Sequence, residues 1–563
     1  MVGLAHLRQV RLLVLGLGFF AAFVAITARL WTIQVDQHAR YLSCARQQDA
    51  ITVPLEEVPR GLILDRHFTP LAGNFTEYRV VVIPGLLQDR YAAARNIGRI
   101  LRVPASDVTR YLDTPGLLPF PITKKQASEI IRASWAGITA APVALRYDNR
   151  PLAVHVVGHL GRIDSSAELA RLRASTDKPY HAGDLVGKAG IEKYYEARLK
   201  GSAPRRMALA YTDATGKLLA GQKVTLAKTP DKNRQNVVLT LDAGIQRAAE
   251  EIMDRHKIKG AIVVQEVNSG DILAMASRPA YHPRQMEEYL EASDGAFTNR
   301  AITLYFPGSL FKIVVAAAAL EEGIVAENEL FFCSGHQDRL VHCWLPEGHG
   351  VITFARAFAE SCNPVFARIA IRLGADCLVT YARRLGLENQ AVTGLPRPPD
   401  PRQSLDAIKE PYNLVNAAIG HWPVFSTPVQ LCSLVATVAR GGIYRQPRLV
   451  KCFTEEGTIV EEVPPAPPRR VLSPRTARKL QHLMALVTAK GQGREAQVPG
   501  WGTAGKTGTA ETAQGERLAW FAGYAPTEHP RLAISVLVEG GASGSRSAAP
   551  VFRELTERIL GSQ

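Results

Sequence analysis

The sequence predicts an α+β protein in which an N-terminal apolar helix precedes a mixed α+β region and a C-terminal domain built on an antiparallel sheet with flanking helices. Three observations support this fold class: an apolar run near the N-terminus, a polar linker near the middle, and strand patterns at both ends of the C-terminal half with helical patterns between them. The chain has 563 residues, which is too long for one compact core, so we expect two or three folded units.

The N-terminal run Leu12–Ala28 is uncharged, mostly apolar and at the short end of the length of a membrane-spanning helix. Arg8 and Arg11 precede it, and basic residues on this side favour a cytoplasmic N-terminus. A cleaved signal peptide is the alternative, but the apolar character continues without a clean small-residue cleavage site. The sequence therefore predicts a single-pass anchor in the cell membrane over residues 12–33, with residues 1–11 in the cytoplasm and the rest exported.

The chain is basic, with a formal net charge of +15, and its apolar fraction of 46% is ordinary for a folded protein. The lysines and arginines are scattered, with no basic tract interleaved with aromatic residues and no zinc-finger spacing. Nucleic acid is therefore not expected as a partner. An anionic membrane surface or an anionic wall polymer fits this charge better, given the N-terminal run.

The polar segment Ala227–Gln235 is typical of a linker, and it separates an exported region of residues 34–230 from a C-terminal domain of residues 236–563. In that domain the tetrapeptide Asn268–Asp271, between β-branched runs, predicts a hairpin. Because strand patterns occur at both ends of the domain, we expect early and late strands to pair in one antiparallel sheet. The expected strands cover residues 237–241, 261–267, 272–276, 506–510, 518–525 and 532–538, and a helix covers residues 245–256.

The first of three short motifs is the pair Ser309 and Lys312. Ser309 follows Pro307-Gly308 and precedes an apolar helical stretch that ends at Gly323. At positions i and i+3 of a helix the two side chains share one face, so the amine of Lys312 reaches the Ser309 hydroxyl. An ordinary lysine, with a pKa of about 10.4, is a poor base at neutral pH, but burial beside other cations lowers its pKa. The alternative is a helix-capping serine next to a solvated lysine.

The second motif, Ser361-Cys362-Asn363, ends the apolar helical stretch Phe354–Ala359. The Ser361 hydroxyl is placed to relay a proton between Lys312 and a leaving amine. The Asn363 amide offers both a donor and an acceptor, which suits a substrate peptide bond. The alternative is an Asx-type helix cap before Pro364.

The third motif is Lys506-Thr507-Gly508-Thr509, which follows a run of small residues. It predicts a strand at a sheet edge against which a peptide backbone packs closely. Lys506 supplies positive charge, and Thr507 and Thr509 supply hydroxyls, for a substrate carboxylate. An ordinary threonine-rich strand is the alternative. Taken together and in this order, the three motifs predict a serine acyl-transfer enzyme in which a lysine activates the nucleophile.

The seven cysteines are spread too thinly for a disulfide framework. Cys333 and Cys343 are the only close pair, and they could form a disulfide on the exported side. His336, His342 and His349 lie near them, but the spacing matches no standard zinc pattern. No metal site is therefore expected.

The three motifs resemble those of the class B penicillin-binding proteins, and the resemblance covers nearly all of the chain. It implies an elongated mixed pedestal domain of the dimerisation type over residues 34–230 and a transpeptidase domain with a five-stranded antiparallel sheet over residues 236–563. The other segments that carry the resemblance are Arg60–Arg66, Gly187–Glu196, Tyr305–Ser309, Gly505–Glu511, Ala519–Tyr524 and Ala548–Pro550.

The resemblance also implies a mechanism. Ser309 would attack the D-Ala-D-Ala bond of a peptidoglycan stem peptide with Lys312 as base, and the backbone N–H groups of Ser309 and Thr509 would form the oxyanion hole. Lys506, Thr507 and Thr509 would hold the terminal carboxylate, and Ser361 would protonate the departing D-Ala. An amine of a second stem peptide would then take the acyl group, and β-lactams would be trapped as stable acyl-enzymes.

No metal or organic cofactor is implied by this resemblance. No glycosyltransferase domain fits beside the pedestal signature, so a separate enzyme would have to polymerise the glycan strands. A polytopic membrane glycosyltransferase is the partner that the resemblance implies, met through the anchor and the pedestal.

The chain departs from the family pattern near the cleft. Gly420-His421-Trp422 stands where many members have Gly-Gln-Gly, which predicts a differently shaped loop. Phe306 and Leu310 occupy positions often held by proline and threonine, which changes the expected packing at the cleft edge. Cys362 is common in the family at its position.

Two other functions stay open on the sequence alone. A D,D-carboxypeptidase or β-lactamase would pass the acyl group to water, but the pedestal signature argues against it. A β-lactam-sensing or scaffold membrane protein would show the same acylation, but such sensors tend to carry several spans or a signalling segment, and neither is found.

Overall fold

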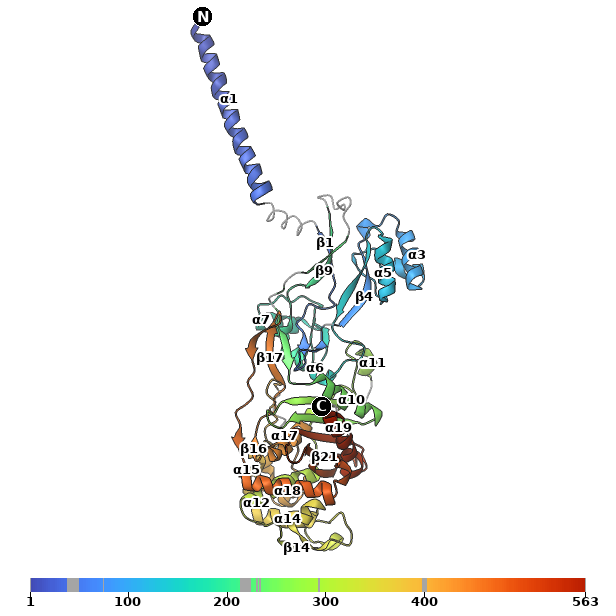
Figure 1. The fold of residues 1–563 in the computed structure, drawn as a ribbon, viewed down its shortest axis with the longest axis vertical. Coiled ribbons are helices and arrows are strands. Elements are labelled where there is room, and N and C mark those ends of the chain that lie inside the picture. The colour runs from blue at the N-terminus through green and yellow to red at the C-terminus, as the bar shows by residue number, and fades with distance from the viewer. Residues whose placement is uncertain are drawn as a thin grey trace. The chain divides into compact units, whose positions relative to one another are not determined.

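The structure is a computed structural model that describes residues 2–37, 50–73, 75–212, 224–228, 231, 234–291, 294–396 and 402–561 (Figure 1). Parts of the expected linker over residues 227–235, and Cys44, lie outside these residues. The described chain forms two compact units. The first contains Met1–Glu57, Thr76–Leu145 and Ala203–Asp231, and the second contains Val58–Phe75, Arg146–Ser202 and Lys232–Gln563.

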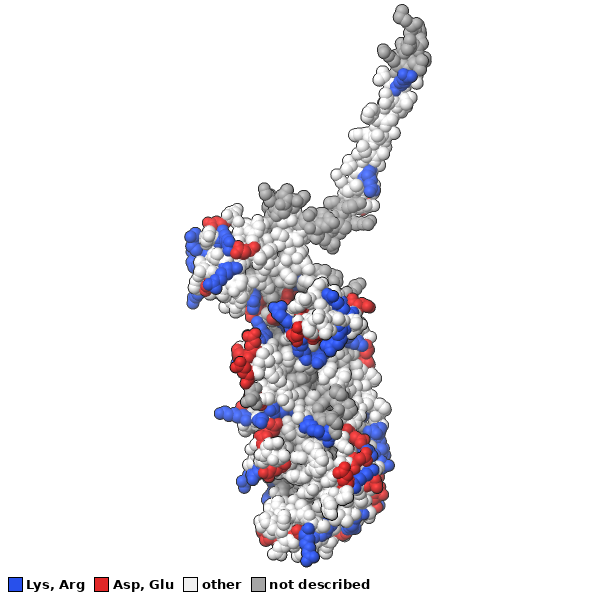
Figure 2. Space-filling model, turned by 180° about the vertical axis from the view of Figure 1, so that it is seen from behind, with Lys and Arg blue, Asp and Glu red and all other residues white. Residues whose placement is uncertain are grey.

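The first unit begins with the long helix α1 (Val2–Trp31). The span Val10–Asp36 is long and apolar enough to cross a membrane, and none of it is buried. In Figure 2 the part of this helix from residue 10 onward is mostly uncharged. An N-terminal apolar helix is thus confirmed, while its orientation stays a prediction. Elsewhere on the face that Figure 2 shows, basic and acidic side chains are interspersed rather than gathered into one basic surface.

The rest of the first unit consists of two small sheets and short helices. One sheet has the strand order β1-β9-β10 and the other β5-β4-β6. Apolar side chains from the second sheet and its helices, among them Val80, Ile97 and Ile130, form a separate core. The elements are β1 (Ala50–Pro54), β4 (Phe75–Val82), α3 (Arg90–Leu101), α4 (Ala105–Thr109), β5 (Gly116–Leu117), α5 (Lys124–Ala133), β6 (Ile138–Leu145), β9 (Arg206–Tyr211) and β10 (Thr225–Lys228).

The second unit is built on a five-stranded antiparallel sheet with the strand order β13-β12-β22-β21-β20. The pairing of early strands with late ones is therefore confirmed. Helix α17 packs on one face, and α10 and α19 on the other, each with its own apolar core. These elements are α10 (Ala243–Arg255), β12 (Gly260–Glu266), β13 (Ile272–Arg278), α17 (Pro428–Ala439), β20 (Ala504–Glu511), β21 (Arg517–Ala525), β22 (Leu532–Glu539) and α19 (Ala549–Gly561).

A second, mixed sheet of this unit joins segments that are far apart in the sequence, in the order β18-β17-β11-β2-β3. Strand β11 (Asn236–Leu239) pairs in parallel with β2 (Ile63–Leu64) and antiparallel with β17 (Val450–Glu455). Parts of the N-terminal region that the sequence analysis placed in a separate domain thus lie in the same compact unit as the C-terminal domain. The expected domain boundaries at residues 34–230 and 236–563 stay a prediction. The remaining strands of this sheet are β3 (Pro70–Ala72) and β18 (Thr458–Glu462).

The two N-terminal segments that carry the family resemblance meet at a buried ion cluster in this unit. The Glu192 carboxylate is fully buried and accepts from Nε of Arg60 at 3.0 Å and from Nε of Arg146 at 2.6 Å. The Tyr147 hydroxyl donates to the same carboxylate at 3.1 Å, and Arg60 also pairs with Glu196 at 2.9 Å. Burial raises the pKa of a carboxyl, but the charges of Arg146 and Arg60 lower the pKa of Glu192 below its usual value.

The other elements of the second unit connect these sheets or cover them. They are α6 (Val154–Val157), β7 (Leu160–Arg162), α7 (Ser166–Ser175), β8 (Leu185–Gly187), α8 (Gly190–Tyr194), α9 (Glu196–Leu199), α11 (Glu287–Leu290), α12 (Lys312–Glu321), β14 (Leu330–Cys333), β15 (Gly350–Thr353), α13 (Phe354–Ala359), α14 (Asn363–Leu373), α15 (Ala375–Arg384), α16 (Asn413–Ala418), β16 (Ile443–Tyr444), β19 (Arg469–Arg470) and α18 (Pro474–Lys490).

Candidate active site

The first motif lies at the start of the buried helix α12. A short 3₁₀ turn, Gly308–Phe311, precedes the helix, and Pro307 stands at its N-cap without a side-chain cap. From Lys312 to Leu320 every residue of α12 is buried, as expected for a helix that is apolar around most of its circumference. Ser309 is therefore not a helix cap and Lys312 is not solvated, so that alternative is wrong.

The side chain of Lys312 is fully buried and points to the second motif. Its Nζ donates to the backbone oxygen of Ser361 at 2.7 Å, to Oδ1 of Asn363 at 2.6 Å and to Oγ of Ser361 at 3.3 Å. Burial lowers the pKa of Lys312 to about 7, although the nearby thiols of Cys362 and Cys343 act in the opposite direction. A lysine with this pKa is unprotonated for much of the time at neutral pH and can act as a base.

The second motif forms the corner between α13 and α14. The backbone of Ser361 has φ = 57°, in the left-handed region, which costs about 1–2 kcal/mol for a non-glycine residue. Asn363 accepts from Lys312 and donates through Nδ2 to the backbone oxygen of His342 at 3.1 Å. The N-cap of α14 is Cys362, without a side-chain hydrogen bond, so the interpretation of Asn363 as a helix cap is wrong.

The third motif lies on the edge strand β20, with Lys506 fully buried. Its Nζ donates to the backbone oxygen of Thr507 at 3.2 Å, and burial together with the charge of Lys312 lowers the pKa of Lys506 well below its usual value. A side chain at Gly508 would bring its Cβ within 2.9 Å of the Pro307 backbone oxygen. A glycine there therefore lets the strand pack directly against the turn that carries the nucleophile.

Thr509 connects the third motif to its surroundings on two sides. Its hydroxyl accepts from the backbone N–H of Gly544 at 3.2 Å. Its backbone oxygen would lie 2.7 Å from a Cβ on Gly308, which has φ = 54°. The main chains of β20 and of the Ser309 turn are therefore in close contact at the site.

The three motifs meet at one cleft with a volume of about 630 Å³. Six of the predicted site residues line it, and the buried Lys312 contacts two of these directly. The lining residues are Ser309, Trp344, Ser361, Asn363, Ile419, His421, Gln492, Thr507, Gly508, Thr509, Arg517, Ala542, Ser543, Ser545 and Arg546.

The sequence analysis missed two groups of cleft residues: Arg517 at the start of β21, and residues 542–546, which follow the last strand β22. Arg517 and Arg546 are exposed and have no ion-pair partner among the described residues, so both offer positive charge to an anionic ligand. Ser543 and Ser545 add hydroxyls beside them. In the sequence, the residues after β22 are marked only by the small polar run 541–547. This run has neither helical nor strand periodicity, so it does not predict a site without the fold.

The loop that departs from the family pattern contributes His421 to the cleft lining and packs aromatic rings around it. The Phe306 ring stacks on Phe425, with 4.6 Å between ring centres, and on His421, with 6.1 Å. Trp422 packs edge-on against Phe425 and stays 55% exposed. Burial and the charge of Lys312 lower the pKa of His421. The backbone N–H of Gly308 donates to the Gly420 oxygen at 3.0 Å, so this loop is anchored beside the nucleophile.

Two family models match the chain. The model of the penicillin-binding protein transpeptidase domain matches residues 260–557, and that of the penicillin-binding protein dimerisation domain matches residues 55–239. Among curated proteins, stage V sporulation protein D of Bacillus subtilis is 28% identical over 96% of this chain and 83% of the relative. Peptidoglycan D,D-transpeptidase PbpA of Mycobacterium tuberculosis is 31% identical over 71% of this chain and 89% of the relative.

Solved structures agree with these matches. A chain of a peptidoglycan synthase complex, described as coordinating polymerization and crosslinking, has a TM-score of 0.71 at 27% identity and covers 98% of this chain and 99% of its own. The ceftriaxone acyl-enzyme of penicillin-binding protein A from Mycobacterium tuberculosis has a TM-score of 0.53 at 31% identity and covers 59% of this chain and 81% of its own. The chain therefore belongs to the class B penicillin-binding proteins. It is a penicillin-binding serine transpeptidase.

Proposed function

We propose that the protein cross-links peptidoglycan as a D,D-transpeptidase, with Ser309 as the nucleophile and Lys312 as its base. The observation that carries these roles is the buried amine of Lys312, which contacts both Ser361 and Asn363 at the base of the cleft that Ser309 lines. Related proteins carry the name peptidoglycan D,D-transpeptidase, and one was solved as a β-lactam acyl-enzyme.

In the first half-reaction, Oγ of Ser309 attacks the carbonyl carbon of the D-Ala-D-Ala bond, and its proton passes to the neutral amine of Lys312. The backbone N–H groups of Ser309 and Thr509 stabilise the negative oxygen that develops, in line with the close approach of strand β20 to the Ser309 turn. The C–N bond then breaks, and Ser361 transfers a proton to the departing amine. Its hydroxyl lies 3.3 Å from Nζ of Lys312, which makes this relay short.

The substrate carboxylate binds along the edge strand. The side chain of Lys506 is buried, and Thr507 and Thr509 line the cleft. Bringing a carboxylate next to Lys506 stabilises the charged form of this amine, so substrate binding and protonation of Lys506 favour each other. The Asn363 amide has one N–H and one oxygen lone pair that are not used by its hydrogen bonds to Lys312 and His342. These groups would bind the substrate peptide bond.

In the second half-reaction an amine of a neighbouring stem peptide attacks the acyl-enzyme. This step returns the Ser309 hydroxyl and forms the cross-link. His421 lines the cleft, and the Phe306 ring stacks on it. A β-lactam would acylate Ser309 in the same way but would retain its leaving group.

The proposed role of Ser309 as the nucleophile is tested by intact-mass spectrometry of the protein after mixing with benzylpenicillin. We expect one stable adduct on the wild-type protein and none on Ser309→Ala. Transpeptidation of glycan strands polymerised beforehand by a separate glycosyltransferase is measured on portions of the same two proteins that have not met penicillin. Rapid loss of the adduct with consumption of penicillin would instead support a β-lactamase, and a stable adduct without cross-linking would support a sensor or scaffold.

The acylation rate is expected to depend on pH through Lys312. Because burial lowers the pKa of Lys312 to about 7, the base is protonated and inactive below pH 7 and neutral above it. The second-order rate constant for benzylpenicillin should therefore rise with pH between about 5.5 and 8 and then level off. His421 lies in the same cleft, so the profile is also measured in His421→Gln, which should keep the same midpoint. A flat profile in both proteins would rule out Lys312 as the base.

We further propose that the N-terminal helix anchors the protein in the cell membrane with residues 1–11 in the cytoplasm and the catalytic unit outside. A polytopic membrane glycosyltransferase would then supply the glycan strands. The long apolar span and the likeness to a chain of a peptidoglycan synthase complex support this arrangement. Replacing residues 12–33 by an unrelated spanning helix should abolish co-purification with the partner, and unchanged co-purification would refute a role for the anchor.

A further inference from the structure

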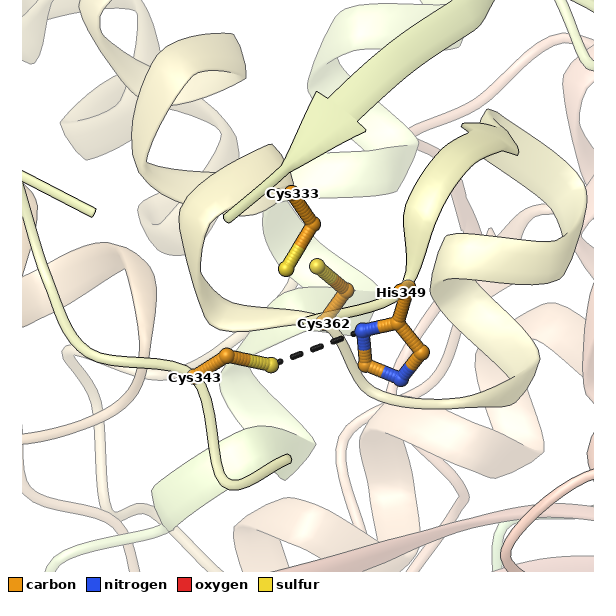
Figure 3. A group of neighbouring side chains, drawn as sticks. All are labelled: Cys333, Cys343, His349 and Cys362. Atoms are coloured by element: carbon orange, nitrogen blue, oxygen red, sulfur yellow. Dashed lines mark hydrogen bonds between the residues drawn. The ribbon is translucent and has the colours of Figure 1, made fainter. Parts of the chain in front are cut away.

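Three cysteines and one histidine lie close together beside the second motif, and one of the cysteines, Cys362, belongs to that motif (Figure 3). Cys333 ends strand β14, Cys343 lies in the following loop, His349 immediately precedes β15, and Cys362 stands at the N-cap of α14. One ligand atom of each residue lies within 4.8 Å of those of the other three. Figure 3 shows the side chains pointing toward a common centre from four separate places in the chain.

The distance between Cys343 and His349 fits a tetrahedral ion, and all four donor atoms lie within 4.8 Å of one another. Zinc binds thiolate sulfur at about 2.3 Å and imidazole nitrogen at about 2.0–2.1 Å, so a tetrahedral site places S and N about 3.6 Å apart and two sulfurs about 3.8 Å apart. Sγ of Cys343 lies 3.5 Å from Nδ1 of His349. All three cysteines are free thiols, so none of the sulfurs is used in a disulfide.

The types of donor atom in the group indicate which metal it would bind. Three thiolates and one imidazole are a standard set for structural zinc, whereas magnesium and calcium require oxygen ligands. Cys333, Cys343 and Cys362 are at most 2% exposed, so no position is left for water or substrate. A site with four protein ligands and no open position is structural rather than catalytic.

We propose that Cys333, Cys343, His349 and Cys362 bind one Zn²⁺ ion. This replaces the expectation of no metal site. The sequence suggested His336 and His342 as neighbours of the cysteine pair, but the Nδ1 of His342 bonds instead to the backbone oxygen of His336, and both histidines lie outside the group.

The ion would fix the second motif. Cys362 stands between Ser361 and Asn363, the two residues that contact Lys312. A metal–thiolate bond at Cys362 ties this corner to the hairpin of β14 and β15, and so helps to hold Ser361 in its left-handed conformation. None of the four residues lines the cleft, although His349 packs edge-on against Trp344, which does. The effect of the ion on activity would therefore be through positioning.

Metal analysis of the full-length protein, purified in detergent without chelators, tests the proposal directly. We expect about one zinc per chain by mass spectrometry of the elements. Cys343→Ser and His349→Ala should lose most of it. Cys452→Ser should retain it, because Cys452 is a free thiol as deeply buried as Cys333 (each 1% exposed) but lies in β17, away from the group.

Chelation of the wild-type protein provides readouts that do not depend on the variants. Removal of zinc should lower the melting temperature and slow acylation by benzylpenicillin, and both should recover when Zn²⁺ is restored. Reconstitution with Co²⁺ should give the visible absorption bands of a tetrahedral thiolate site. These measurements stand even where a variant fails to fold.

Three results would overturn the proposal: no bound metal after exposure of the reduced wild-type protein to excess Zn²⁺, a disulfide between Cys333 and Cys343 in the native protein, or unchanged metal content in both ligand variants. Loss of β-lactam acylation in a zinc-loaded protein would instead count against the proposed function and leave the metal site intact.

Discussion

A Lys312→Met variant is expected to fold but to be acylated by benzylpenicillin about 10²- to 10⁴-fold more slowly than the wild-type protein, the range typical for loss of a general base. Methionine has nearly the length of lysine and is apolar, so it fits a side-chain position that is fully buried. The Ser309 hydroxyl would keep its place in the turn but would lose the acceptor of its proton. Competition between benzylpenicillin and a chromogenic cephalosporin, followed by stopped flow, measures this loss.

Lys312→Arg is the matched control, because arginine keeps the positive charge but does not give up its proton in proteins. We expect it to be as slow as Lys312→Met if proton acceptance is the role of Lys312. Recovery of near wild-type rates in Lys312→Arg would show that Lys312 acts only through its charge. Circular dichroism and melting curves establish that both variants are folded.

Glu192→Ala is expected to destabilise the second unit by about 3–5 kcal/mol, because it leaves two buried arginines without their shared partner. Arg60 and Arg146 are at most 4% exposed, and both donate to the Glu192 carboxylate. Denaturant unfolding followed by fluorescence measures the change in the free energy of unfolding.

Glu251→Ala is the matched control for a single acid–base pair. Glu251 pairs with Arg558, and both side chains are more than a third exposed, so the expected change is at most about 1 kcal/mol. Equal effects of the two substitutions would refute the structural importance of the buried cluster. Since the pKa of Glu192 is lowered in the folded state, its stabilising effect is present at neutral pH and is lost as the pH falls through that lowered pKa.

The central sheet could be predicted from the sequence because each of its strands carries a local signal. The turn Asn268–Asp271 marks the hairpin of β12 and β13, β21 and β22 are long and mostly apolar, and β20 carries the third motif. The observed bounds of these three late strands differ by at most two residues from the expected ones. The partners of β11 could not be predicted in this way. Strands β2 and β3 have only two and three residues, too few to show an alternating pattern.

The sequence predicted residues of the three motifs as the site, but it did not predict which partners these residues contact. Ser309, Lys312 and Asn363 were named from motif order, but Asn363 alone has the local pattern of a helix cap, because Pro364 follows it. Its actual partners, Lys312 and the His342 backbone, come from distant segments. The cysteine and histidine group was missed for the same reason, since Cys362 reaches it only through the fold.

The mixed sheet of the second unit also constrains the order in which the chain can fold. Strand β11 needs β2, more than 170 residues before it, and β17, more than 200 residues after it. Closing loops of this length is entropically costly and slow, and until it happens both edges of β11 expose unpaired backbone groups. A chain synthesised from its N-terminus therefore carries an open edge of β11 until β17 has been made, which makes protection from aggregation a requirement for its biogenesis.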